Sequence, residues 1–64
     1  MDDYGMLTAV SAPPTVIEAE ILKRTLVDAG IRATVALTNE GPRVMVWPEN
    51  EDEAIQILRT RRAR

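Results

Sequence analysis

The chain has 64 residues and a formal net charge of -2, and 45% of its residues are hydrophobic. This length allows one domain, and the hydrophobic fraction is typical of folded globular proteins. The sequence contains neither Cys nor His, which excludes disulfides and thiolate metal sites and removes the usual general base near neutral pH. Because so short a chain usually needs support beyond its own core, we expect oligomerisation to supply it.

Charge and hydropathy exclude two classes of partner. The negative net charge disfavours general electrostatic attraction to nucleic acid. No apolar run approaches the roughly 20 residues that span a bilayer, and residues 1–5 lack the basic and then apolar layout of a signal peptide. We therefore expect a cytoplasmic protein that contacts neither nucleic acid nor a membrane.

The N-terminal part of the chain predicts a short strand. Residues 6–11 are rich in strand-forming side chains, and Pro13 and Pro14 end the run because proline cannot join a sheet ladder. We assign residues 1–5 to a tail and the whole of 1–64 to a single domain.

A capping pattern opens the first predicted helix. The Thr15 hydroxyl can accept a hydrogen bond from the amide of Glu18, whose carboxylate can reach back to the Thr15 amide. The helix is expected to run to Ala29 and to end on Gly30, because glycine tolerates the left-handed conformation. Its expected core stripe consists of Ala19, Leu22, Leu26 and Ala29, with Val16 and Val27 on its shoulder.

Two isoleucines do not fit this stripe. Ile17 and Ile21 are one turn apart, more than about 100° from the stripe's centre, and lie among polar residues. The interpretation that we favour is that they border a broad core face. The alternative is a small exposed patch for a partner.

A second strand is predicted by alternation over residues 31–37. The expected core-facing positions are Ile31, Ala33, Val35 and Leu37, and the opposite positions are Arg32, Thr34 and Ala36. Residues 38–42 form a turn cluster, in which Asn39 and Gly41 supply unusual backbone angles and Pro42 blocks continuation of the strand.

Residues 43–48 predict the central strand. Val44 and Val46 point to one face and Met45 and Trp47 to the other, because successive side chains alternate along a strand. Both faces therefore carry apolar groups. The strand follows the turn directly, so it forms an antiparallel hairpin with residues 31–37.

The last element is a helix over about residues 51–61, frayed over 62–64. Asn50 is the expected N-cap, and the acidic first turn complements the positive end of the helix. The expected buried side consists of Ala54, Ile55, Ile57 and Leu58. A cation site on the acidic run of residues 49–53, or an anion site on the basic run of 59–64, is the less favoured interpretation, since solvated helix ends explain both runs.

The element order strand, helix, strand, strand, helix predicts an α+β fold. A helix crossover makes the two outer strands parallel, and the hairpin places the third strand between them in the order 1-3-2. This is a truncated ferredoxin-like βαββα arrangement, a three-stranded sheet with two helices on one face.

Two surfaces are left without a cover in this arrangement. The first strand is an edge that could pair with another chain, which makes Leu7 and Ala9 candidate contact residues. The open sheet face carries Met45 and Trp47. Together with Ile17 and Ile21, these are the interface residues that the sequence predicts. No catalytic constellation accompanies them, so we expect no enzyme and no cofactor.

Five stretches carry a resemblance to a known family. Residues 11–13, 18–23, 26–31, 44–48 and 54–58 resemble a family of small bacterial domains of unknown function that is labelled as prokaryotic signal-transducing proteins. Members of that family are similar in fold to the PII-like, ferredoxin-like group.

The resemblance covers roughly residues 6–58. It implies a fold and a signal-transducing role, and it carries no catalytic residue to this chain. The chain lacks the long loop with which PII proteins bind nucleotides, so ATP binding is not expected.

We therefore expect a non-enzymatic regulatory or protein-interaction module that forms a homodimer, with a further protein partner left open. The dimer contact would use the edge of the first strand or the face of Met45 and Trp47. The alternative is a small-molecule sensor that holds a ligand against Trp47 at a subunit interface.

Overall fold

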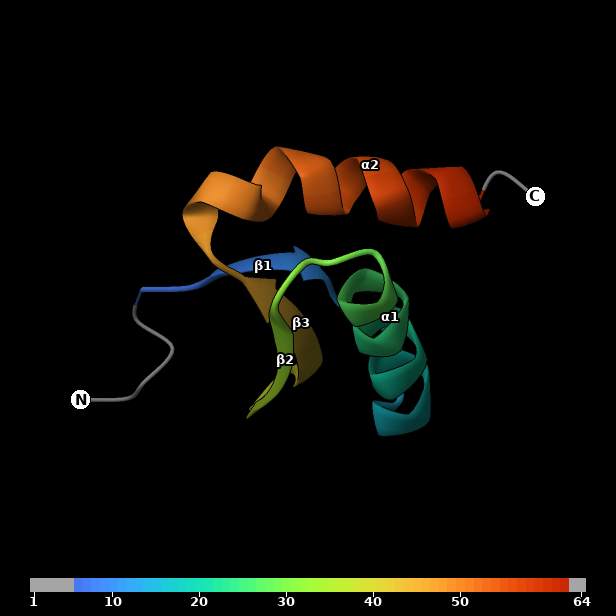
Figure 1. The fold of residues 1–64 in the computed structure, drawn as a ribbon. Helices are drawn as coiled ribbons and strands as arrows, with labels where there is room; N and C mark the ends of the chain where they lie inside the picture. Colours follow the sequence, from blue (N-terminus) through green and yellow to red (C-terminus); the bar gives the residue numbers. More distant parts are fainter. Residues whose placement is uncertain (1–5, 63–64) are drawn as a thin grey trace.

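The computed structural model describes residues 6–62, and over this range the chain forms three strands, two α-helices and one short 3-10 turn (Figure 1). In chain order these elements are β1 (Thr8–Ser11), α1 (Val16–Asp28), β2 (Ala33–Thr38), β3 (Gly41–Val46), η1 (Pro48–Asn50) and α2 (Glu51–Arg62). The predicted tail of residues 1–5 and residues 63 and 64 lie outside the described residues.

The sheet has the predicted topology. Its strand order is β1-β3-β2, and both outer strands pair antiparallel with β3. The two outer strands therefore run parallel to each other, as a helical crossover requires. The fold is the small ferredoxin-like βαββα arrangement that the order of elements predicts.

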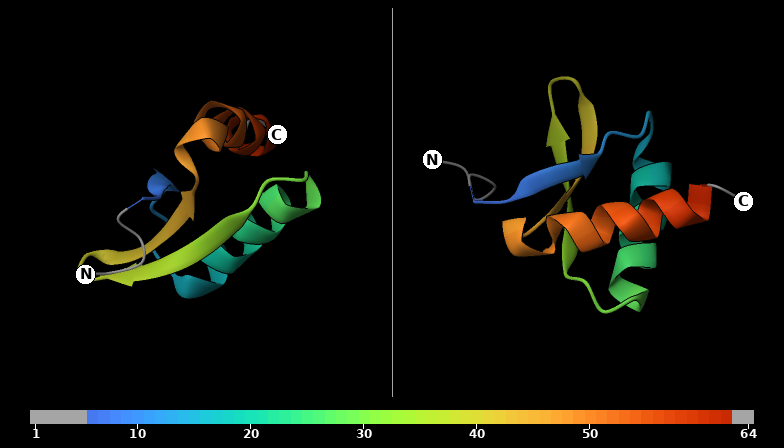
Figure 2. Two further views of the ribbon diagram at one scale, coloured as in Figure 1. Left: turned by 60° about the vertical axis from the view of Figure 1, so that its left-hand side comes forward. Right: turned by 90° about the horizontal axis from the view of Figure 1, so that it is seen from above.

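Both helices cover the same face of the sheet. Leu26 of α1 and Val44 and Val46 of β3 are the largest fully buried side chains. Figure 2 shows α2 crossing over α1, and the two helices contact each other and the sheet. The buried core cluster consists of Ala19, Leu26, Ile31, Val44, Val46, Ala54 and Leu58. Its members come from both helices, from β3 and from the loop that follows α1.

The C-terminal end of α1 is closed as predicted. Gly30 has a φ of 90° and its amide donates to the carbonyl of Val27, while the amide of Ile31 donates to Leu26 at 2.9 Å. This pair of bonds is the Schellman motif, and the contact between the buried Ile31 and Leu26 completes it. Ala29, which we expected in the core stripe, is instead exposed in this cap.

The N-terminal end of α1 has half of the predicted capping box. The amide of Glu18 donates to the Thr15 hydroxyl at 3.2 Å. Among the bonds of the described residues, none joins the Thr15 amide to the Glu18 carboxylate. The carboxylate is therefore free to point elsewhere.

The hairpin turn is tighter than predicted. Only Asn39 and Glu40 lie between β2 and β3, and the Thr38 hydroxyl accepts from the amide of Glu40 at 3.1 Å and donates to the carbonyl of Gly41 at 2.8 Å. Of the two residues expected to supply unusual angles, Gly41 does so with a φ of 112°, whereas Asn39 has a negative φ.

Pro42 does not block the strand as predicted but lies within β3. The pairing with β1 reaches only from Val44 to Val46, so β3 has a neighbour on one side alone at Pro42, which pairs with Leu37 of β2. Proline has no amide hydrogen to donate, and it is tolerated where a strand has an edge.

The strands begin and end at other residues than predicted. Met6 and Leu7 precede β1, Ile31 is buried in a loop before β2, and Trp47 follows β3. The predicted assignment of β2 side chains to the two faces of the sheet is also wrong at the C-terminal end of the strand. Leu37 is 71% exposed, because it lies beside the turn beyond the reach of the helices, whereas Ala36 is buried outside the core cluster.

α2 begins at Glu51, as predicted. Asn50 precedes it directly and also ends η1, where its amide donates to the Trp47 carbonyl. Ala54 and Leu58 are buried as predicted, and Ile55 and Ile57 are half-buried. In the part of the chain that the structure describes, neither helix is long and apolar enough to cross a membrane.

Candidate interaction surfaces

The open face of the sheet carries a shallow hollow of about 160 Å³. We call it the Trp47 hollow. It brings together side chains that are distant in the sequence, because the loop before β1, the start of β2 and the end of β3 meet there. Its lining consists of Leu7, Arg32, Ala33, Thr34, Met45, Val46 and Trp47.

The register of β3 explains how Met45 reaches this hollow. Met45 pairs with Thr34 on β2 and with Ala9 on β1, so the three side chains share the face opposite the core. Met45 is half-buried by these neighbours, and Trp47 is 38% exposed. Neither residue belongs to the core cluster. Met45 and Trp47 thus line one hollow, as the sequence leads us to expect, and their role as interface residues stays a prediction.

The edges of the sheet differ in their suitability for pairing. β1 has four residues and a bulge between Ala9 and Ser11, which disrupts a regular ladder. β2 is the second edge, which the prediction did not consider, and it pairs with β3 without interruption from Ala33 to Thr38. Of the predicted edge residues, Ala9 is exposed on β1, whereas Leu7 lies before the strand and lines the Trp47 hollow.

Ile17 and Ile21 are exposed on the outer side of α1, and the interpretation that they border the core is wrong. They are 74% and 56% exposed, because α1 packs on the sheet through its opposite side. Val16 and Val27, expected at the shoulder of the core, are also about half exposed. Charged side chains of both signs surround this apolar patch, including an ion pair of 3.7 Å between Glu20 and Lys23.

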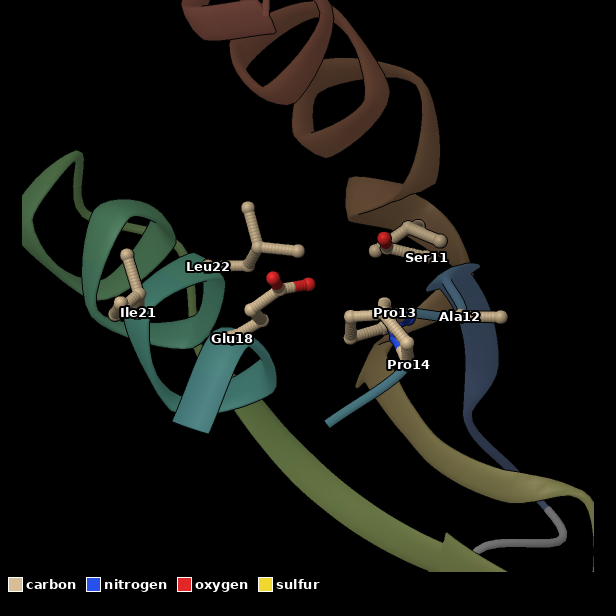
Figure 3. Close-up of a pocket in the computed structure, with 8 residues that line it drawn as sticks. Ser11, Ala12, Pro13, Pro14, Glu18, Ile21 and Leu22 are labelled. Carbon is tan, nitrogen blue, oxygen red and sulfur yellow. The ribbon is translucent and has the colours of Figure 1, made fainter. Parts of the chain in front are cut away.

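A larger groove lies between α1 and the chain segment that leaves β1. We call it the proline groove, and its volume is about 440 Å³. Its lining consists of Val10, Ser11, Ala12, Pro13, Pro14, Glu18, Ile21 and Leu22. Figure 3 shows the Glu18 carboxylate pointing from α1 towards the opposite wall, and the Ser11 hydroxyl on that wall facing α1.

Sequence reasoning missed the proline groove, although it gave other roles to several of the residues that line it. Pro13 and Pro14 were interpreted only as a strand stop, and Glu18 only as half of a capping box. The unused half of that box leaves the carboxylate of Glu18 in the groove. The position of α1 against the end of β1 creates the cavity, and that position has no local signal in the sequence.

The acidic run before and within α2 gathers no candidate metal site. Over residues 6–62, no three Asp or Glu side chains come together in a way that could hold an ion. Glu51, Asp52 and Glu53 occupy the first turn of α2, where their charges complement the positive end of the helix.

Comparison with known proteins adds no relative: no family model, no curated protein and no solved structure matches this chain. The similarity to prokaryotic signal-transducing proteins therefore stays a prediction that rests on the stretches quoted above.

Proposed function

We propose that this chain is a non-enzymatic regulatory or protein-interaction module that acts as a homodimer through the Trp47 hollow and the open sheet face around it. The observation that carries the proposal is the position of Met45 and Trp47. Both lie side by side on a face that no described element covers, and Trp47 is 38% exposed. Tryptophan and methionine are enriched at protein interfaces, where burial of their large apolar surface stabilises the complex.

A second copy is the partner that this face fits best. In a C2 dimer the same patch contacts itself, so an apolar patch is complementary to its own copy. Among the described residues, Arg32 is the one charged side chain that lines the hollow, and it can keep its guanidinium at the rim while its stem packs against Trp47. The small buried core gives the association a thermodynamic role, because binding between folded subunits stabilises both.

The open face is a better candidate than the β1 edge. Strand addition at β1 would have to form on four residues that include a bulge, and the pairing would have few regular hydrogen bonds. The face needs no new backbone pairing, since its apolar side chains are already ordered by the hairpin. The family resemblance supports a regulatory, signal-transducing role for the resulting dimer.

The alternative, a sensor for a small molecule held against Trp47, would also depend on the dimer. The Trp47 hollow measures about 160 Å³, whereas pockets for small ligands usually measure roughly 300–1,000 Å³. The hollow of one subunit is thus too small to enclose a ligand. A thermal-shift screen of nucleotides, amino acids and organic acids tests this alternative, because a ligand that binds only the folded protein raises Tm.

Sedimentation equilibrium of the whole chain over about 1–200 μM, a range set by typical weak dimer affinities, tests the proposal. We expect a reversible dimer, and Trp47→Ala should raise its Kd at least about tenfold, the loss typical of a central aromatic contact. Ile17→Ala is the matched control, because it also removes an exposed apolar side chain, and it should leave Kd unchanged. A monomer throughout the range, or an equal effect of the two variants, would contradict the proposal.

A further inference from the structure

The proline groove has the features of a ligand site that is separate from the dimer surface. It lies between α1 and residues 11–14, whereas the Trp47 hollow lies on the other side of the sheet from the helices. Its walls are mainly apolar. Pro13 is buried and rigid, and Leu22 and Val10 pack against the core below. The groove is therefore supported by the fold.

Two polar groups of the groove make no hydrogen bond or ion pair with other described parts of the chain. The Glu18 carboxylate makes no hydrogen bond or ion pair with the side chains that the structure describes, and the same is true of the Ser11 hydroxyl. Both groups point into the groove from opposite walls (Figure 3). A carboxylate and a hydroxyl that face each other across an apolar groove can both accept hydrogen bonds from an ammonium group.

A second hollow extends the groove towards α2. It measures about 260 Å³ and shares three lining residues with the proline groove, namely Val10, Ser11 and Leu22. Its remaining lining comes from α2 and includes Arg59, which has no ion pair with the other described side chains. The combined groove is thus lined by the carboxylate-bearing Glu18 in its first part, by apolar side chains along its length and by Arg59 in its second part.

We propose that this combined groove binds a short apolar peptide with free ends, two or three residues long. The peptide's ammonium would bind the Glu18 carboxylate and the Ser11 hydroxyl, and its carboxylate would bind the Arg59 guanidinium. The termini of an extended di- or tripeptide are about 7–10 Å apart, so they reach two different parts of the groove, whereas a single amino acid carries both charges on one carbon. Apolar side chains of the peptide pack on Leu22 and Val10.

An NMR titration of the 15N-labelled chain with L-leucyl-L-leucine tests the proposal. We expect saturable shifts in residues 10–22 and 55–59, with a Kd on the order of 1 mM, since a ligand this small at an open site binds weakly. N-acetyl-L-leucyl-L-leucine lacks the ammonium and should bind about three- to fivefold more weakly, the range of an exposed charge pair. The C-terminal amide of the dipeptide lacks the carboxylate, and its affinity should fall by a similar factor.

Variants assign each end of the peptide to its residue. Glu18→Gln should weaken binding of the free dipeptide about three- to fivefold and leave binding of the acetylated dipeptide unchanged. Arg59→Gln should weaken binding of the free dipeptide by a similar factor and leave binding of the amidated dipeptide unchanged. Glu20→Gln is the control, because this exposed carboxylate on α1 lines no part of the groove. No shift at about 10 mM dipeptide, ten times the expected Kd, or equal binding of free and acetylated peptide, overturns the proposal.

Peptide binding in the combined groove and dimerisation through the Trp47 hollow use different residues and are tested separately. Trp47→Ala should leave the peptide Kd unchanged, and Glu18→Gln should leave the dimer Kd unchanged. Shifts centred on Trp47 rather than on residues 10–22 would show that the peptide binds the Trp47 hollow, which would overturn the groove assignment.

Discussion

The apolar side chains of β3 and of Trp47, which follows it, differ in how far the fold buries them. Val44 and Val46 are 0% and 1% exposed beneath both helices, whereas Met45 is half-buried and Trp47 is 38% exposed on the other side. Alternation along the strand explains why they separate, and only one side is closed because both described helices pack on that side. Hydrophobic composition alone therefore does not identify the core of a chain this short.

The same contrast recurs on α1. Ala19 and Leu26 are fully buried, whereas Ile17 and Ile21, which are as large as leucine, are exposed. The helix presents Ala19 and Leu26 to the core cluster, and the isoleucines remain on the solvent side. Burial in this molecule follows position relative to β3 rather than side-chain size.

The strongest test of this inner and outer contrast is Leu26→Ala. Leu26 is fully buried in the core cluster, so the truncation should cost about 2–5 kcal/mol of unfolding free energy. A domain of this size has roughly 3–10 kcal/mol in total, so we expect a largely unfolded variant in urea or thermal melts. Ile21→Ala on the outer side of the same helix should change stability by less than about 0.5 kcal/mol. Comparable losses of unfolding free energy in Leu26→Ala and Ile21→Ala would show that the two sides of α1 do not differ in burial.

A hydroxyl moved between the faces of the sheet gives the second test. Val44→Thr places a hydroxyl beneath the helices, where it should cost about 1–3 kcal/mol. The reverse change on the outer face, Thr34→Val, should be nearly neutral in the same urea titration, because Thr34 is only half-buried there. If Thr34→Val is as costly as Val44→Thr, the outer face is more tightly closed than the structure indicates.

The C-terminal cap of α1 sharpens the comparison, since it directs Ile31 into the core. Gly30 has a φ of 90°, and a Cβ there would meet nothing within 4 Å. Gly30→Ala should therefore lower the unfolding free energy by about 1–2 kcal/mol through backbone strain alone. Gly30→Asn should lose less, because asparagine tolerates this conformation. Thermal melts of the two variants provide the measurement, and equal losses would indicate that strain is not the cause.

The smallest expected changes in unfolding free energy come from the two residues of the predicted capping box. Thr15→Ala removes the hydroxyl that accepts from the Glu18 amide, and it should cost about 0.5–1 kcal/mol. Glu18→Gln should cost only a few tenths of a kcal/mol, because the Glu18 carboxylate points into the proline groove instead of bonding the Thr15 amide. A larger loss for Glu18→Gln in chemical denaturation would show that the carboxylate caps the helix in solution.

Predictions from the sequence succeeded where a residue acts through its own backbone neighbours. Thr15 and Gly30 mark the ends of α1, because a side-chain cap and a left-handed glycine are local devices. The predictions failed where the position of a residue depends on a segment that is distant in the sequence. Pro42 was expected to stop a strand, and it lies in β3 because β1 does not reach that far.

The candidate sites divide in the same way. The grouping of Met45 and Trp47 followed from alternation and from the count of elements available to cover them. The proline groove could not be predicted, since Glu18 and Ser11 face each other only because α1 packs beside the end of β1.

The sequence by itself determined the element order, the ends of α1 and the βαββα topology, because caps, turns and hydrophobic periodicity act over a few residues. Only the tertiary structure decided that Ile17 and Ile21 face solvent, that Leu37 lies beyond the helices, and that a groove opens beside Pro13. These outcomes depend on where a helix of finite length is placed on a twisted sheet, and that placement is set by the packing of all the elements together.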